Sequence, residues 1–267
     1  ELSHEQKLVF DKYISGQNIF ITGPGGTGKS EIIRKIYKDA YSKNKNIQVT
    51  ALTGCAAVLL NCSAKTIHSW AGIGLGTSES SKLIDKIRKN QFYKKVWKQI
   101  QILIVDEVSM MSVKLFDHLN KIGKALRHSS RPFGGIQVIF AGDFYQLPPV
   151  GNKEDPDTQN FCFESPEWNT CFPLENQITL KKIFRQKDMD YCQILNQIRQ
   201  GKLKAKTIDT LSTFVGRIAE SRLVITPTKL YPTRSKVDAI NNEFMSKLDT
   251  PEKRFKISHH KDLEMSK

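Results

Sequence analysis

The amino-acid sequence predicts an α/β fold with a mostly parallel sheet, and two observations support this prediction. Short apolar runs rich in β-branched residues lie at residues 18–22, 47–52, 101–106 and 136–141. Such nearly continuous runs are typical of parallel strands that are buried on both faces. Segments with helical periodicity alternate with these runs, which indicates helices that cover both faces of the sheet.

The other expected elements follow in order along the chain. Helical patterns occupy residues 28–42, 65–70 and 113–127, and a loop rich in Gly, Asn, Asp and Pro follows at 151–160. Beyond this loop we expect strands at 178–180 and 223–226 and helices at 188–199 and 233–247. We therefore place a domain boundary near Leu180, with one domain at 1–180 and the beginning of a second, incomplete domain at 181–267.

The charge of the chain favours a polyanionic partner. Its 267 residues include 41 Lys and Arg against 27 Asp and Glu, which gives a net charge of +14 and a pI near 9.5. An excess of this size is typical of proteins that bind nucleic acid. The alternative is a lysine-rich surface that only reflects a biased genome.

Several classes of protein are not expected. No apolar run approaches the roughly 20 residues of a membrane span, and the N-terminal residues lack the basic start and apolar stretch of a signal peptide. The five cysteines form no C-x-x-C pair, which argues against a disulfide framework or a zinc site and favours a reducing compartment. Because the chain opens within a motif, we expect that further sequence precedes it.

The strongest motif is a phosphate-binding loop between an expected strand and an expected helix, the context that this motif requires. Its glycines let backbone N–H groups point at phosphate oxygens, and the N-terminus of the following helix adds positive potential. Lys29 is expected to reach the β- and γ-phosphates of a nucleotide, and Ser30 to hold Mg²⁺. The alternative is a plain glycine-rich turn. The loop reads Gly23-Pro24-Gly25-Gly26-Thr27-Gly28-Lys29-Ser30.

Two further strands end in polar side chains at the edge where ligands gather in open α/β sheets. Asp106 and Glu107 follow one strand; Asp106 is expected to orient Mg²⁺ and Glu107 to polarise the attacking water. Gln146 follows the next strand and is expected to sense the γ-phosphate. The alternatives are a helix N-cap with a first-turn acid and an exposed turn closed by two prolines. A nucleoside kinase stays open at this point.

Together the motifs resemble the PIF (petite integration frequency) family of superfamily 1 DNA helicases, which are similar to RecD-type 5′-to-3′ motors. Several family motifs occur in order along nearly the whole chain. They are Leu2-Ser3-His4-Glu5-Gln6 (Q motif), Thr53-Gly54-Cys55-Ala56-Ala57 (motif Ia), residues 66–74 (motif Ib, with Trp70 where Phe is commoner), Asp106-Glu107-Val108-Ser109-Met110 (motif II), Phe133-Gly134-Gly135-Ile136-Gln137 (signature stretch), residues 142–150 (motif III) and Phe184-Arg185-Gln186 (motif IV).

The resemblance assigns roles that the spacing does not. It implies that Gln6 contacts adenine and that Arg185 is an arginine finger, reaching the γ-phosphate from the second domain. Motifs Ia and Ib line a single-strand channel in the family, which implies DNA contacts here. The residues alone support plainer alternatives, namely a turn, a packed histidine and a surface cation. The implied DNA contacts are Thr53, Gly54, Thr66 and His68.

A basic segment at residues 82–98 interleaves lysines and an arginine with three aromatic residues. In the family, a small inserted element near the strand-separating wedge lies at this position, which corresponds to residues 75–99. Basic residues can track phosphates while aromatic residues stack on bases, so we expect DNA contacts from Lys94, Lys95 and Lys98. The alternative is a solvated helix whose aromatic residues pack on the core.

The resemblance implies a RecA-like ATPase domain followed by the start of a second RecA-like domain. The expected function is an ATP-dependent DNA helicase that moves 5′ to 3′ on single-stranded DNA and unwinds duplex or structured DNA. The alternatives are an ATP-dependent translocase that does not unwind and a nucleic-acid-binding module that uses ATP as a switch. The expected cofactors are ATP and Mg²⁺. The expected partners are single-stranded, forked or structured DNA and replication or repair proteins, with no membrane.

The family's motifs V and VI have no counterpart after residue 228. We therefore expect an incomplete second domain and a chain that by itself binds ATP but hydrolyses little of it. The expected location is intracellular: nuclear or mitochondrial in a eukaryote, cytoplasmic in a bacterium or virus. The resemblance implies roles in DNA replication, repair, recombination and telomere maintenance.

Overall fold

The computed structural model describes residues 2–217, 228–251 and 253, and the chain divides into two units, Glu1–Lys204 and Ala205–Lys267. The expected strand at 223–226 lies outside the described residues. The segment 181–204, which we expected to begin a second domain, belongs to the first unit. That the second unit begins another RecA-like domain stays a prediction.

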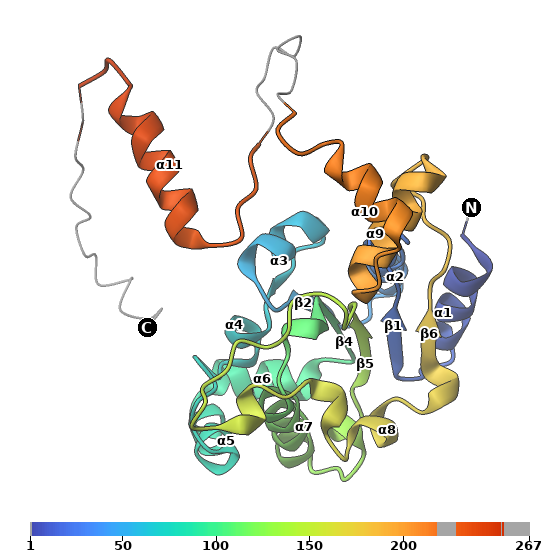
Figure 1. Cartoon of the computed structure of the whole chain (residues 1–267). Coiled ribbons are helices and arrows are strands. Elements are labelled where there is room, and N and C mark those ends of the chain that lie inside the picture. The colour runs from blue at the N-terminus through green and yellow to red at the C-terminus, as the bar shows by residue number, and fades with distance from the viewer. Residues whose placement is uncertain (1, 218–227, 252, 254–267) are drawn as a thin grey trace. The chain divides into compact units, whose positions relative to one another are not determined.

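A six-stranded sheet of order β3-β2-β4-β5-β1-β6 forms the centre of the first unit (Figure 1). Every pairing in it is parallel, which confirms the predicted α/β class. The five predicted strands that the structure describes agree with it to within one residue at each end. The strands are β1 (Ile19–Thr22), β2 (Ile47–Ala51), β3 (Lys65–Thr66), β4 (Ile102–Asp106), β5 (Gln137–Ala141) and β6 (Gln177–Thr179).

Helices cover both faces of this sheet, and neighbouring residues of one strand serve opposite faces. Ile19 and Ile21 of β1 pack in one buried cluster with helices α1 and α2, whereas Phe20 packs in the other cluster with α7. The helices of the first unit are α1 (His4–Ile14), α2 (Lys29–Ser42), α3 (Gly54–Leu60), α4 (Ile67–Ala71), α5 (Ser80–Lys89), α6 (Gln91–Gln99), α7 (Val113–Arg127), α8 (Trp168–Cys171) and α9 (Met189–Gln200). Those of the second unit are α10 (Ala205–Ser212) and α11 (Arg234–Ser246).

Four of the predicted helices correspond to α2, α7, α9 and α11, and the fifth, at 65–70, is β3 followed by α4. The sequence did not predict α1 or α3. The expected inserted element at 75–99 contains α5 and α6, which pack on α7 as part of the main core. Within the described ranges, no helix has both the length and the apolar character needed to cross a membrane.

A tight turn, η2 (Pro132–Gly135), docks on α7 and sets the start of β5. Asn120 Oδ1 accepts a hydrogen bond of 2.8 Å from the Phe133 N–H, and Arg127 Nε donates one of 2.9 Å to the Gly134 carbonyl. The Arg127 Nη1 also donates to three carbonyls around the end of α6. The two backbones approach so closely that a Cβ on Gly123 would lie 2.6 Å from the Phe133 carbonyl oxygen.

Replacing Gly123 with Ala should destabilise the first unit, because the added methyl group overlaps backbone that has no rotamer to adopt. Overpacking of this kind costs about 1–3 kcal/mol in the free energy of unfolding, which denaturant unfolding measures. The matched control is Gly54→Ala, since a Cβ there meets nothing within 4 Å and Ala favours a helix. Equal stability of the two variants would mean that η2 can move away from α7 at no cost.

Candidate nucleotide-binding site

A cavity of about 660 Å³ lies at the edge of the sheet where β4 and β5 end. Side chains from separate stretches of the chain line it together, and each was predicted to act on a nucleotide. The structure therefore brings these residues into one site, while their individual roles stay predictions. They are Ser30, Asp106, Glu107, Gln146 and Arg185.

The phosphate-binding loop joins β1 to α2, as the motif requires. Lys29 Nζ donates hydrogen bonds of 2.7 Å to the Gly23 carbonyl and 3.1 Å to the Pro24 carbonyl, so the ammonium lies over the loop. Burial lowers the pKa of Lys29, and the negative charges of Asp143 and Asp106 oppose this shift. Lys29 is half-buried, so part of its ammonium is shielded from water beside the loop.

Two glycines of the loop are required by the residues that press against it. Gly26 and Gly28 have φ of 82° and 83°, which favours glycine. A Cβ on Gly26 would lie 2.7 Å from Arg185 Cβ, and one on Gly28 would lie 2.5 Å from Gln6 Nε2. The Phe184 N–H also donates to the Gly26 carbonyl at 2.8 Å. Motif IV therefore packs on the loop within the first unit, and Arg185 need not reach it from another domain.

Gln6 lies beneath the loop and is 3% exposed. Its Oε1 accepts from the Ser3 N–H at 3.0 Å, which completes a capping box at the start of α1. Its Nε2 donates to the Thr27 and Gly28 carbonyls at 3.3 and 3.4 Å. Gln6 thus supports the loop in this structure, and its predicted adenine contact stays a prediction that requires some of these bonds to be exchanged.

The two carboxylates after β4 differ in environment. Asp106 is 5% exposed, and burial together with the charge of Glu107 raises its pKa to about 6. Glu107 is half-buried and adopts φ 58°, ψ 40°, a left-handed conformation that costs a non-glycine residue roughly 1–3 kcal/mol. Such strain is concentrated at functional sites. The conformation turns the chain sharply after the strand, so both carboxylates remain beside the cavity.

The sequence did not single out two charged residues that belong to the site, Asp143 and Arg199. Asp143 follows β5 and is 1% exposed. Arg199, in the last turn of α9, donates to both oxygens of its carboxylate at 2.6 and 2.7 Å. The aspartate could have been suspected from its place after a predicted strand, but no local pattern marks the arginine that pairs with it.

Of four residues predicted to contact DNA, Thr53 lines the nucleotide cavity, whereas Gly54, Thr66 and His68 do not. Thr53 and Thr66 are the N-caps of α3 and α4, where their hydroxyls accept from the N–H groups of Ala56 and Ser69 at 3.3 Å. Gly54 is the first residue of α3. Burial lowers the pKa of the half-buried His68, which favours its neutral form. The hydroxyls of Thr53 and Thr66 therefore cap helices in this structure, and their contacts with DNA stay predictions.

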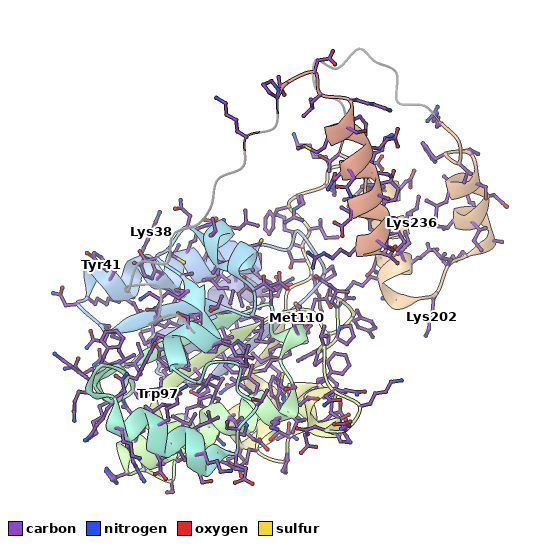
Figure 2. All side chains as sticks on the ribbon, turned by 90° about the vertical axis from the view of Figure 1, so that its left-hand side faces the viewer. Lys38, Tyr41, Trp97, Met110, Lys202 and Lys236 are labelled. Carbon is purple, nitrogen blue, oxygen red and sulfur yellow. The ribbon has the colours of Figure 1, made fainter. Side chains whose placement is uncertain are left out.

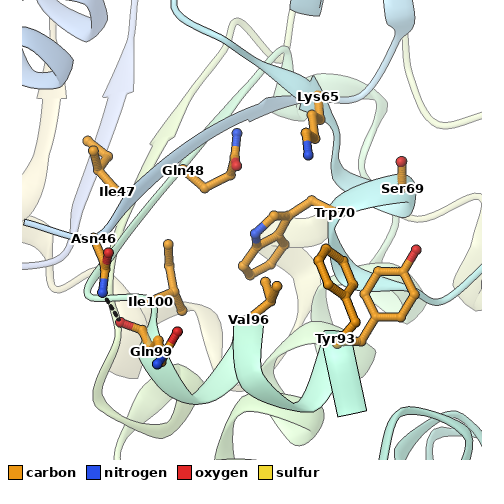
Figure 3. Close-up of a pocket in the computed structure, with 11 residues that line it drawn as sticks. Asn46, Ile47, Gln48, Lys65, Ser69, Trp70, Tyr93, Val96, Gln99 and Ile100 are labelled. Carbon is orange, nitrogen blue, oxygen red and sulfur yellow. Dashed lines mark hydrogen bonds between the residues drawn. The ribbon is translucent and has the colours of Figure 1, made fainter. Parts of the chain in front are cut away.

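The part of the basic segment that forms α6 has lysines at the surface, but not all of its aromatic residues are exposed. Lys95 and Lys98 are exposed and Lys94 is half-buried. Trp97, labelled in Figure 2, is fully buried, and its indole N–H donates to the Ala71 carbonyl at 3.1 Å, so it cannot stack on a base. Phe92 is 64% exposed. Tyr93 and Phe92 line a pocket of about 260 Å³ between α6 and α4, with Lys65 and Trp70 on its other side (Figure 3).

A second sequence pattern lies apart from the phosphate-binding loop. Residues 152–155 read N-K-E-D and fit the N-K-x-D pattern that reads guanine in GTPases. Asn152 and Asp155 line a different cavity, together with His68 and Lys114. Lys114 Nζ donates to Asp155 at 2.5 Å. Asp155 is thus paired with Lys114, and residues 152–155 do not line the cavity at the ends of β4 and β5.

Comparisons with known proteins agree with these features. The PIF1-like helicase family model matches residues 1–209. ATP-dependent DNA helicase PIF1 of Candida albicans is 42% identical over 252 residues, covering 90% of this chain and 27% of that protein. The PIF1 helicase of Emericella nidulans is 41% identical over 249 residues, covering 92% and 32% respectively. The chain thus spans about a third of the length of these curated relatives.

Solved structures show the same likeness. The crystal structure of Pif1 helicase from Candida albicans matches with a TM-score of 0.84 at 39% identity, covering 94% of this chain and 56% of that one. Pif1 from Bacteroides in complex with ADP-AlF3 and ssDNA matches with a TM-score of 0.78 at 25% identity, covering 94% and 58%. The predicted RecA-like fold of the first unit is confirmed by these neighbours. Because the family model matches most of its length, the chain belongs to the PIF1-like helicase family.

Proposed function

We propose that this chain forms the nucleotide-binding part of an ATP-dependent DNA helicase that moves 5′ to 3′ on single-stranded DNA and unwinds duplex or structured DNA. The observation that carries the proposal is the single cavity lined by Ser30, Asp106, Glu107, Gln146 and Arg185 beside the phosphate-binding loop. The names of the relatives support it, as do the structure of Bacteroides Pif1 with ADP-AlF3 and ssDNA and a structure that concerns DNA unwinding at forked dsDNA by two Pif1 helicases.

The residues of the cavity fit a Mg²⁺ ion bound together with ATP. Ser30 and Asp106 present a hydroxyl and a carboxylate to the same space, and oxygen atoms are the ligands that Mg²⁺ prefers. Bound there, the ion would neutralise charge on the β- and γ-phosphates. With a pKa of about 6, Asp106 is mostly ionised at neutral pH and can take up this role.

The remaining side chains divide the work of hydrolysis. Glu107 accepts a proton from the attacking water, and Gln146 binds near the γ-phosphate. Lys29 and Arg185 stabilise negative charge on the phosphoryl group as it is transferred, which is the main contribution a protein makes to this reaction. Glu107 and Gln146 lie on loops after neighbouring strands, so the sheet holds them on one side of the phosphates.

Thr53 offers a route from the nucleotide to DNA. It lines the same cavity as Glu107 and Gln146, and it also caps α3, the helix that carries motif Ia. Thr53 therefore places the N-terminus of α3 at the wall of the cavity in which the γ-phosphate is proposed to bind. We propose that ATP binding and hydrolysis act on the single-strand channel in this way.

The proposal is tested by ATP turnover with and without single-stranded DNA and by strand displacement on a 5′-tailed fork, each with a Lys29→Ala variant as control. In a protein with a complete second domain we expect DNA-stimulated turnover and 5′-to-3′ displacement, whereas this chain by itself should hydrolyse little ATP. Lys29→Ala should abolish turnover and displacement, because the ammonium that donates to the Gly23 and Pro24 carbonyls of the loop is lost. Turnover without displacement would favour a translocase, and binding without turnover a switch. Near-normal turnover by Lys29→Ala would remove the phosphate-binding loop from the mechanism.

Glu107→Gln should keep ATP binding but slow hydrolysis, since the amide preserves the shape of the side chain and cannot accept a proton from water. Removal of a general base typically costs about 10²–10⁴-fold in rate. Nucleotide titration and single-turnover hydrolysis measure the two effects separately. If ATP binding is lost together with hydrolysis, Glu107 supports the strained turn after β4 and does not act on water.

DNA affinity should fall steeply with salt, with a log–log slope of about −0.7 per phosphate contacted on a single strand. Replacing Lys94, Lys95 and Lys98 with Gln should make this slope shallower, because counterion release from those contacts is lost. A control of equal charge replaces three exposed lysines on α1, α2 and α7, which are Lys7, Lys38 and Lys121. Equal slopes for the two triple variants would assign the α6 lysines to a solvated surface.

A further inference from the structure

The carboxylate of Asp143 is the most enclosed charge beside the nucleotide cavity. It is 1% exposed and accepts a two-pronged pair of bonds from Arg199, of 2.7 Å from Nε and 2.6 Å from Nη2. Burial opposes its ionisation, but the bonds from Arg199 and Gln146 outweigh burial and hold the pKa of Asp143 below its ordinary value. Asp143 is therefore an ionised, buried acceptor whose charge depends on Arg199.

This carboxylate orients Gln146. The Gln146 Nε2 donates to Asp143 Oδ2 at 3.2 Å, and its backbone N–H donates to the Asp143 carbonyl at 2.8 Å. Because an ionised carboxylate only accepts hydrogen bonds, the amide must turn its NH₂ group toward Asp143. Its Oε1 and one remaining amide hydrogen are then left for other partners in the cavity that Gln146 shares with Glu107.

Arg199 is held in its position by its own neighbours. Its guanidinium carbon lies 4.3 Å from the centre of the Tyr145 ring, a stacking contact that suits a planar cation. With Asp143, Gln146 and Pro24 of the phosphate-binding loop, it lines a second cavity of about 290 Å³. Arg199 thus connects the last turn of α9 to the turn that follows β5. Both lie beside the phosphate-binding loop.

We propose that Arg199 is a positioning residue for the reaction: it holds Asp143, Asp143 orients Gln146, and this chain of contacts makes the γ-phosphate contact depend on the position of α9. The inference rests on the proposed ATPase function and adds a residue to it. Arg199 acts through two other residues and does not touch the reacting atoms. A plain structural ion pair would affect stability alone, whereas this role requires a specific loss at the stage when the phosphoryl group is in transfer.

The test compares binding of Mg·ADP with binding of Mg·ADP plus aluminium fluoride, which stands in for the phosphoryl group during transfer. In the unmodified chain the fluoride complex should bind more tightly than ADP. Arg199→Gln should weaken the fluoride complex by roughly 10–100-fold, the usual loss when a supporting side chain is removed, and change ADP affinity by less than about threefold. Arg199→Lys, which keeps the charge but loses the fork, should recover only part of the loss.

A double variant then separates this role from a general loss of packing. If Arg199 acts through Gln146, then Arg199→Gln combined with Gln146→Ala should lose no more fluoride affinity than Gln146→Ala alone. The matched control is Lys124→Gln, which breaks a partly buried ion pair of 2.6 Å with Glu167 and should leave both affinities unchanged. Additive losses, or an Arg199→Gln variant that prefers the fluoride complex over ADP as strongly as the unmodified chain does, would overturn the proposal.

The same measurements distinguish failure of the inference from failure of the proposed function. If the chain discriminates the fluoride complex but a protein with a complete second domain shows no DNA-stimulated turnover, the helicase proposal fails, and the binding data alone decide the role of Arg199. If that protein hydrolyses ATP with DNA stimulation while Arg199→Gln and Arg199→Lys retain full turnover and binding, only the inference fails. Absence of any discrimination in the unmodified protein also overturns it, since Gln146 would then have no contact to lose.

Discussion

The parallel register of β1 with its two neighbours is the constraint on which the site depends. Ile21 of β1 lies level with Ala141 of β5 and with Ile178 of β6. The phosphate-binding loop and the Asp143 turn therefore leave the sheet at the same height, each beginning two residues after a level pair. A slip of one residue would exchange the buried faces of a strand and would also part the loop from the residues that complete it. The geometry of the candidate nucleotide site is thus a consequence of how the sheet buries its apolar side chains.

Features encoded locally could be predicted from the sequence. The strands were visible as apolar runs such as Ile102–Asp106, because a strand buried on both faces needs apolar residues at every position. The phosphate-binding loop was visible in its glycines, and Glu107 in its place directly after a strand. Helix α1 was missed because it is mostly polar and buries few residues, and α3 because its Val58 and Leu59 are about 80% exposed. Neither helix has the regular apolar stripe from which a helix is predicted.

Contacts between distant segments could not be predicted in the same way. Phe92 and Trp97 belong to one basic helix, yet the first is exposed and the second is enclosed against α4 and α7. Which aromatic residue turns inward depends on the neighbouring helix, and the spacing alone favours neither. The Arg199–Asp143 pair joins residues on two separate elements, and the sequence of α9 contains nothing that identifies the partner. Gln6 was singled out through a motif, but its hydrogen bonds to the phosphate-binding loop follow from the packing of α1 against that loop, which the sequence does not reveal.

The charges around the cavity favour a nucleotide that arrives together with a cation. Arg199 already neutralises Asp143, so that carboxylate adds little net repulsion toward phosphate. Among the residues that the structure describes, no salt bridge neutralises Asp106 or Glu107, and burial together with the charge of Glu107 raises the pKa of Asp106. ATP alone would bring more negative charge to these two carboxylates, and burial disfavours the charged form of the nearby Lys29. A divalent cation held by Asp106 and Ser30 would reduce this repulsion, would favour the ionised form of Asp106 and would leave Lys29 to bind phosphate. We therefore propose that this arrangement of charges favours the metal complex of ATP over free ATP.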